Sequence, residues 1–190
     1  MLSYEEIFIA IGSNLETQNL SRLEIINSAL GYFSQFNIIL IKVSSFLESR
    51  SYPDKSQPNF INAVSEVHSE LNPYQILHAL KNIEKKMGRK NKTRWGNRVL
   101  DLDIIGAGSI ILPNNFEFNK WLKMPLKKQI KIQPDELILP HPRIQDRLFV
   151  LRPLNEVDPY WTHPVLNKTP LELINRKVWG EENFTKKIEN

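Results

Sequence analysis

Cysteine is absent from the 190 residues of this chain, which excludes disulfides, thiolate metal sites and a cysteine nucleophile. No apolar run approaches the roughly 20 residues that a membrane-spanning helix needs. The first residues also lack the basic and then apolar layout of a signal peptide. We therefore expect a protein with no membrane contact and a cytoplasmic location.

Two common phosphate-binding motifs are missing as well. The sequence contains neither G-x-x-x-x-G-K-[ST] nor G-x-G-x-x-G, which argues against a P-loop enzyme. Hydrophobic residues make up 41% and charged residues 24%, the balance of a globular domain rather than a disordered chain. We expect one domain over residues 1–175, with a long insertion at 113–134 and a polar C-terminal tail at 176–190.

The order of the predicted elements indicates an α+β fold. Apolar or alternating runs predict four strands, at residues 7–11, 38–46, 60–67 and 99–105. Apolar residues at helical spacing predict two helices, at 21–33 and 73–87. This βαββαβ order is typical of a ferredoxin-like core, with a mainly antiparallel sheet, helices packed on it and C-terminal additions. We expect residues 113–134 to be irregular with a hairpin at most, 148–151 to be extended, and the tail to be frayed.

Positive charge gathers in one segment, although the net charge of the chain is only +4. Residues 85–98 contain seven basic side chains and no acid. A stretch of that density suits polyanions, either nucleotide phosphates or nucleic acid. A solvated basic loop is the alternative, and composition alone leaves both interpretations open.

The tripeptide Asp101-Leu102-Asp103 lies on the last predicted strand. Because strand side chains alternate, both carboxylates point to the same face of the sheet. Two neighbouring carboxylates repel each other unless a cation lies between them, and Mg²⁺ suits such a pair. An exposed edge strand with acids facing water is the alternative interpretation. The arginines of Arg94-Trp95-Gly96-Asn97-Arg98, directly upstream, favour the metal, since guanidinium groups match phosphate oxygens.

At this point the sequence resembles the 6-hydroxymethyl-7,8-dihydropterin pyrophosphokinases along nearly all its length. The most specific segments are R-W-G-x-R-x-L-D-L-D-I, at residues 94–104, and L-P-H-P-R, at 139–143. Further matching segments are residues 11–15, 43–46, 60–64, 88–89 and 147–154. The resemblance implies that diphosphate passes from ATP to the pterin hydroxymethyl group and that AMP leaves.

The resemblance also implies a set of site residues. Two Mg²⁺ ions would join the ATP phosphates to Asp101 and Asp103, and the catalytic set would be Arg94, Arg98, Asp101 and Asp103. The side chains expected near ATP are Glu84, Arg89, Arg94, Ile104, His141, Arg143 and Arg147. Those expected around the pterin are Ser49, Ser51, Tyr52, Phe60, Asn62, Trp95, Asp101 and Phe149.

Bland alternatives stand beside these assignments. Phe60 and Phe149 would form an aromatic sandwich around the pterin, but ordinary core packing would explain them equally. Glu84 could be a solvent-facing acid beside Lys81 or Lys85. A nucleic-acid-binding module of ferredoxin-like fold and a non-catalytic relative are the rival functions. The paired aspartates argue against RNA, so we expect no nucleic-acid partner, and we expect a monomer, with association with another folate-pathway enzyme left open.

Overall fold

The computed structural model describes residues 4–51, 54–89, 96–129, 131–176, 178–180 and 185–188. The strands are β1 (Tyr4–Ser13), β2 (Ile39–Val43), β3 (Leu47–Ser49), β4 (Phe60–Ser69), β5 (Asp101–Ala107) and β6 (Thr185–Lys187). The helices are α1 (Arg22–Tyr32), α2 (Pro73–Lys86), α3 (Asn115–Lys123), α4 (Leu126–Gln129), α5 (Leu148–Val157) and α6 (Pro170–Asn175). Two 3₁₀ turns are η1 (Phe33–Phe36) and η2 (Ile144–Asp146). Within the described ranges, no helix is long and apolar enough to cross a bilayer.

These strands form one sheet in the order β5-β1-β4-β3-β6, and β2 joins it by pairing with β4. All of the pairings are antiparallel, which confirms the predicted antiparallel sheet. The single strand predicted over residues 38–46 is divided into β2 and β3. Between them the Ser44 hydroxyl accepts the amide hydrogen of Val64 at 3.1 Å, so a side chain takes part in the ladder there.

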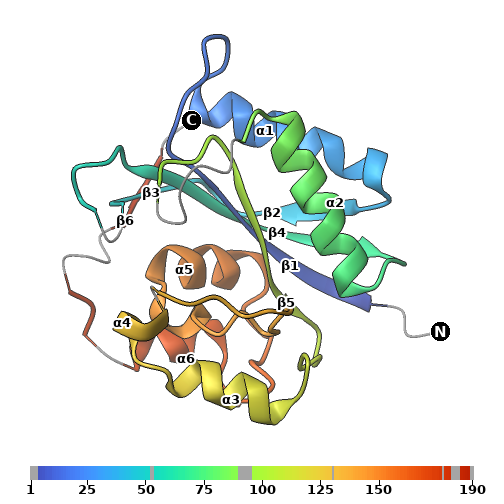
Figure 1. The fold of residues 1–190 in the computed structure, drawn as a ribbon, viewed down its shortest axis with the longest axis vertical. Helices are drawn as coiled ribbons and strands as arrows, with labels where there is room; N and C mark the ends of the chain where they lie inside the picture. Colours follow the sequence, from blue (N-terminus) through green and yellow to red (C-terminus); the bar gives the residue numbers. More distant parts are fainter. Residues whose placement is uncertain are drawn as a thin grey trace.

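Helices α1 and α2 cover one face of this sheet, while α3 to α6 lie on the other side (Figure 1). Each of the first two begins with a capping box, Ser21 with Glu24 in α1 and Asn72 with Gln75 in α2. Pro73 occupies the first turn of α2, where its missing N–H costs nothing. Both predicted helices are therefore confirmed, by the local signals that predicted them.

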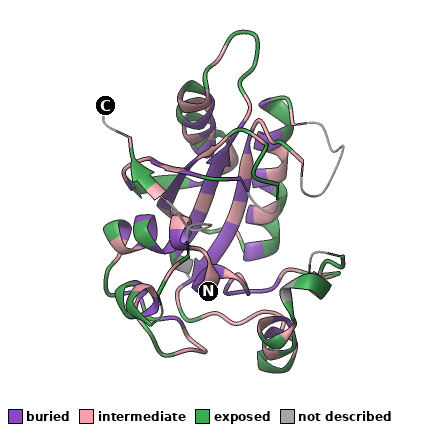
Figure 2. Cartoon of the chain, turned by 90° about the vertical axis from the view of Figure 1, so that its left-hand side faces the viewer, coloured by how far each residue is buried: buried purple, intermediate pink, exposed green. Residues whose placement is uncertain are grey.

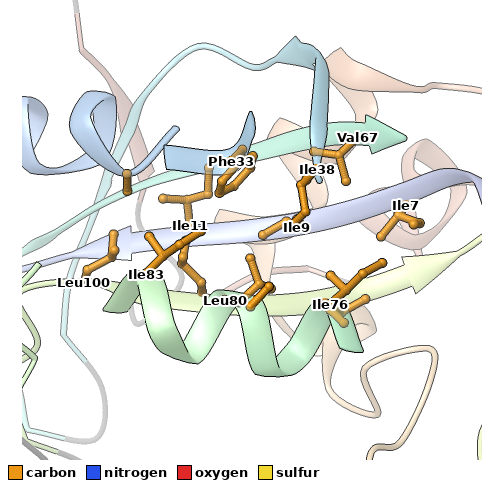
Figure 3. Close-up of a cluster of buried hydrophobic side chains, with 14 of the residues drawn as sticks. Ile7, Ile9, Ile11, Phe33, Ile38, Val67, Ile76, Leu80, Ile83 and Leu100 are labelled. Atoms are coloured by element: carbon orange, nitrogen blue, oxygen red, sulfur yellow. The ribbon is translucent and has the colours of Figure 1, made fainter. Parts of the chain in front are cut away.

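The larger core lies between the sheet and these two helices (Figure 3). Ile9 and Ile11 of β1 belong to the same buried cluster as Leu80 and Ile83 of α2. Full burial of each such side chain contributes about 1.5–3 kcal/mol. The alternation along β1 thus fixes which of its residues face α1 and α2.

A second core covers the opposite face of the sheet. Phe8 of β1 is 0% exposed and clusters with Val64 of β4, Ile105 of β5 and Leu151 of α5. The central strands are consequently buried on both sides over most of their length (Figure 2). A polar site on this face has to lie where polar residues or glycine interrupt the apolar pattern.

The expectation that residues 113–134 are irregular is wrong, because α3 and α4 lie there. Asn114 caps α3 by accepting the amide hydrogen of Glu117 at 3.0 Å. Phe118 and Trp121 stand three positions apart on one face of α3 and form a small core with Ile138. The spacing of the two aromatic residues was the helical signal in the sequence.

Two further expectations are also wrong. Residues 148–151 are not extended but begin α5, whose buried residues include Leu148, Leu151 and Leu154 at helical spacing. Pro153 lies inside α5, where proline is usually disfavoured. The tail is not frayed throughout, because β6 pairs with β3 and the amide of Ile188 donates to the carbonyl of Phe46 at 2.9 Å.

Candidate active site

A row of paired residues crosses the second face of the sheet. Asp101 of β5 lies opposite Gly12 of β1, and Gly12 lies opposite Asn62 of β4. Residues paired directly across antiparallel strands share a face, so Asp101 and Asn62 flank a position that has no side chain. A Cβ atom on Gly12 would lie 3.5 Å from Phe60 Cδ1 and 3.8 Å from Asn62 Oδ1. The glycine therefore leaves space beside the ring of Phe60 and the amide of Asn62.

The predicted pterin residues on β3 and β4 are neighbours around this space. Asn62 is 6% exposed, and its amide nitrogen donates to Ser49 Oγ at 2.9 Å and to the carbonyl of Leu47 at 3.3 Å. These bonds fix the amide so that its oxygen faces the Gly12 position. The arrangement is that of a polar edge beside an aromatic ring, which suits a flat heterocycle.

The two aspartates behave as the alternation predicts. The side chains of Asp101 and Asp103 are 23% and 34% exposed, whereas Leu102 and Ile104 are buried in the larger core on the opposite face. Both carboxylates thus lie on the same face as Gly12 and Asn62. The side chain of Ile104 points away from them, which leaves only its backbone for the predicted contact with ATP.

Cationic groups surround Asp101. Its Oδ1 atom accepts from Arg89 Nη1 at 2.9 Å and also from Arg98 Nη1. Burial lowers the pKa of the Arg98 guanidinium, but Asp101 and then Asp103 outweigh that effect, and the pKa is raised overall. The sequence predicted that these arginines and aspartates lie together, and the structure brings them into direct contact.

Glu84 is not the solvent-facing acid of the bland alternative, since its side chain is 2% exposed. It pairs with Arg89 and with Lys81 Nζ at 3.1 Å, and it accepts the amide hydrogen of Leu102 at 2.7 Å. Burial raises the pKa of Glu84, while Lys81, the Leu102 amide and Arg89 act in the opposite direction. A buried carboxylate with these partners joins α2 to the strand that carries both aspartates.

His141 lies next to the aspartate strand, because its backbone amide donates to the carbonyl of Ile105 at 2.9 Å. Its Nδ1 atom accepts the amide hydrogen of Arg143 at 3.1 Å, which assigns the ring proton to Nε2. Burial, followed by the charges of Arg147 and Arg143, holds the pKa of His141 well below its ordinary value. The ring is therefore neutral and donates through Nε2.

Arg147 Nη1 lies 3.4 Å from that same Nε2 atom. Two donors at this distance can share one acceptor, and an anionic oxygen suits them both. Burial lowers the pKa of Arg147, and Asp103 and Asp101 raise it, which shows that its charge lies within reach of both aspartates. The Arg147 guanidinium also lies 5.9 Å from the ring centre of Phe149, the first-turn aromatic residue of α5.

Comparison with known proteins settles the family. A model of the 7,8-dihydro-6-hydroxymethylpterin-pyrophosphokinase (HPPK) family matches residues 8–159. The chain belongs to this family.

Curated HPPK relatives match over most of the chain. The 2-amino-4-hydroxy-6-hydroxymethyldihydropteridine pyrophosphokinase of Haemophilus influenzae is 35% identical over 151 residues, 79% of this chain and 79% of the relative. The protein of the same name from Bacillus subtilis is 32% identical over 151 residues, 79% of this chain and 76% of the relative. The folic acid synthesis protein fol1 of Pneumocystis carinii is 35% identical over 161 residues, 85% of this chain but 18% of fol1.

Solved HPPK structures share the fold. A Plasmodium falciparum HPPK-DHPS triple mutant superimposes with a TM-score of 0.64 and covers 90% of this chain, which spans 44% of that protein. The sequence identity is 17%, so this likeness concerns the fold alone.

Three of the residues expected in the HPPK site, Tyr52, Arg94 and Trp95, lie outside the described residues. Ser51 is described and buried, and Asn14 connects it to the arginine segment. The Asn14 amide nitrogen donates to Ser51 Oγ at 3.4 Å and to Asn97 Oδ1 at 2.9 Å, and its oxygen accepts the amide hydrogen of Arg98 at 2.7 Å. Sequence reasoning assigned Asn14 no role, although it lies in one of the matching HPPK segments.

Gln129 of α4 was also missed, and no motif in the sequence marks it. It is 7% exposed, its nitrogen donates to the carbonyls of Trp121 and Met124 at 2.8 Å each, and its oxygen accepts from Arg143 Nη1 at 3.4 Å. The insertion therefore supports an arginine of the predicted HPPK nucleotide site.

Replacing Gln129 with leucine is expected to destabilise the protein and to raise KM for ATP. The carbonyls of Trp121 and Met124 would lose their donor, and an unsatisfied buried group costs about 1–3 kcal/mol. Arg143 would lose one of its supports. Chemical unfolding and steady-state kinetics measure both effects, with Gln133→Leu as the exposed control in the same segment. Unchanged stability and KM would show that the contacts of Gln129 carry no weight.

Proposed function

We propose that this HPPK-family chain transfers diphosphate from ATP to the hydroxymethyl group of 6-hydroxymethyl-7,8-dihydropterin, releasing AMP, in folate biosynthesis. The observation that carries the proposal is the position of Asp101 and Asp103 on one face of β5, beside the guanidinium groups of Arg89 and Arg98. The activity is also the one named for the Haemophilus influenzae and Bacillus subtilis relatives.

The donor set suits magnesium. Mg²⁺ commonly takes one or two protein carboxylates and completes its shell with water and phosphate oxygens. Among the described residues, both arginine contacts of Asp101 use Oδ1, which leaves Oδ2 for a metal. Asp101 and Asp103 would hold two Mg²⁺ ions, and when bound these would neutralise phosphate charge and orient the nucleotide.

The cationic groups would act on the phosphates of ATP. Phosphoryl-type transfer depends mostly on placement and on neutralising charge at the transferring group. Arg89 and Arg98 would lie on one side of the phosphates, and Arg143, Arg147 and the neutral donor His141 on the other. Arg94, outside the described residues, is assigned to the transferring group by the family pattern alone.

The pterin would lie over Gly12. Phe60 and Phe149 would contact the two faces of its ring, while Asn62 and the backbone of Ser49 to Ser51 would bind its polar edge. Asp101 lies across Gly12 from Asn62, so the hydroxymethyl group would point toward the metal-bound phosphates. This direction is what in-line attack on the β-phosphorus requires.

The architecture and state of the protein complete the proposal. We assign the sheet order and the helices α1 and α2 to a ferredoxin-like core, in a single domain over residues 1–175. We propose a monomer in the cytoplasm that binds no nucleic acid. Arabidopsis thaliana has a relative named folate synthesis bifunctional protein, which makes a second enzyme of the same pathway a reasonable partner.

The decisive experiment identifies the products. The protein, ATP, Mg²⁺ and the pterin alcohol are expected to yield AMP and the pterin diphosphate in equal amounts, measured by anion-exchange chromatography. EDTA is expected to stop the reaction. Formation of ADP and a pterin monophosphate would contradict diphosphate transfer, and no pterin-dependent product would favour the non-catalytic relative.

A further inference from the structure

The strand that carries both aspartates is an edge of the sheet, because β5 stands at the end of the strand order. Edge strands expose backbone N–H and C=O groups that have no partner strand. On β5 the exposed groups of Leu102 are bound by α2 instead. The Leu102 amide donates to Glu84 Oε1 at 2.7 Å, and Lys81 Nζ donates to the Leu102 carbonyl at 3.2 Å.

Lys81 is the centre of this contact. Its ammonium group lies 3.1 Å from Glu84 Oε1, one turn further along α2, and 3.9 Å from Asp103 Oδ1. Its stem leaves the side chain 39% exposed, so the head group is held by these contacts rather than by enclosure. A single side chain thus contacts the buried acid, the backbone between the two aspartates and one aspartate itself.

The contacts form a closed circuit around the aspartate strand. Lys81 joins Asp103 to Glu84, Glu84 joins Lys81 to Arg89, and Arg89 joins Glu84 to Asp101. Opposite charges alternate around the circuit. Removal of the Lys81 ammonium would open it at Asp103 and would leave the Leu102 carbonyl without that donor.

We propose that Lys81 is a positioning residue that fixes the spacing and direction of Asp101 and Asp103 for a divalent metal-nucleotide complex. The inference rests on the proposed function. Lys81 acts through Leu102 and Asp103 and needs no contact with substrate. Loss of such an outer partner typically costs 10–100-fold in metal affinity, and a misplacement of about 1 Å can cost about 10²-fold in rate.

The test uses Lys81→Met, which keeps the aliphatic length and removes the charge and the donor. Lys81→Arg restores both, and Lys85→Met removes an exposed lysine from the same helix as the matched control. Free Mn²⁺ is measured by electron paramagnetic resonance in the presence of a non-hydrolysable ATP analogue. Lys81→Met is expected to weaken Mn²⁺ binding about 10–100-fold and to lower kcat more than it raises KM for the pterin. Lys85→Met is expected to match the unchanged protein, and Lys81→Arg to recover most of the binding.

The sign of the change makes the test sharp. If Lys81 merely repelled the metal, Lys81→Met would bind Mn²⁺ more tightly, and that result would overturn the proposal. Unchanged Mn²⁺ binding with a lowered unfolding temperature would also overturn it, since the role would then be structural. Lys81→Ala gives a second variant in case Lys81→Met does not fold. If the unchanged protein makes no pterin diphosphate but Lys81→Met still weakens Mn²⁺ binding, the proposed function fails and the positioning role stands.

Discussion

Replacing Asp103 with asparagine is expected to abolish diphosphate transfer and to leave the stability of the fold unchanged. Asparagine has the same shape but no charge, so a metal loses one of its two carboxylates. We expect the rate to fall at least about 10³-fold, equivalent to ~4 kcal/mol of transition-state stabilisation. Stability should hold because Asp103 is 34% exposed and its nearest cationic contact is Lys81 at 3.9 Å.

Replacing Asp101 with asparagine is expected to abolish transfer too, but with a loss of stability. Asp101 neutralises two guanidinium groups, those of Arg89 and Arg98, whose side chains are 17% and 24% exposed. Removal of one partner leaves these charges partly buried and unpaired, which we expect to cost about 2 kcal/mol. The two aspartates would then be equal in catalysis and unequal in folding.

AMP release and urea unfolding of the two variants measure this contrast, with Asp135→Asn as an exposed acid that serves as control. The unfolding is followed without nucleotide, so that metal binding does not add to stability. Near-normal turnover by Asp103→Asn would exclude a metal role for this carboxylate. Equal stability of both variants would show that the arginine pairs of Asp101 contribute nothing to folding.

The sequence alone was sufficient for the features that depend on local periodicity. Strand alternation predicted that Asp101 and Asp103 share one face, and the burial of Leu102 and Ile104 bears this out. Caps and a first-turn proline predicted α1 and α2 in the same way. Each of these signals is complete within a few residues, so no knowledge of the remaining chain was needed.

Features that depend on distant contacts could not be predicted. Glu84 looked like a surface acid, because its burial follows from the packing of α2 against β5, 18 residues away at Leu102. Asn14 binds the amide of Arg98 across 84 residues, and Gln129 reaches Arg143 from the insertion. For α5, the interior Pro153 opposed the apolar spacing, and only packing on the sheet decides in favour of a helix.

The second large effect concerns His163, which lies outside the proposed site. The residue is 0% exposed, and its ring packs between Phe118 of α3 and Trp161, with centroid distances of 5.6 and 5.7 Å. Its Nδ1 atom accepts the amide hydrogens of Val165 and Leu166 at 3.2 Å each. Burial lowers the pKa of His163 from 6.5 to about 4, so the ring is neutral in the folded protein.

Acid is therefore expected to weaken the fold through His163. A histidine whose pKa is lower in the folded state binds its proton more readily when the chain unfolds. Its contribution is complete above pH 6.5, the value for the unfolded chain, and is lost as the pH falls toward about 4. At roughly 1.4 kcal/mol for each pH unit, the loss over that window is about 3 kcal/mol.

The measurement is urea unfolding at several pH values between 7.5 and 4, for the unchanged protein and for His163→Asn. Asparagine can present an oxygen near the position of Nδ1 and so keep the bonds to Val165 and Leu166, but it does not titrate. The variant is expected to be less stable at pH 7.5, because the contacts with Phe118 and Trp161 are lost, and to lose less stability in acid. His68→Asn, at a side chain that is 44% exposed, is the control and should follow the unchanged protein. If the pH dependence of His163→Asn is the same as that of the unchanged protein, protonation of this ring does not drive the acid transition, and the other buried histidine, His141, becomes the group to replace next.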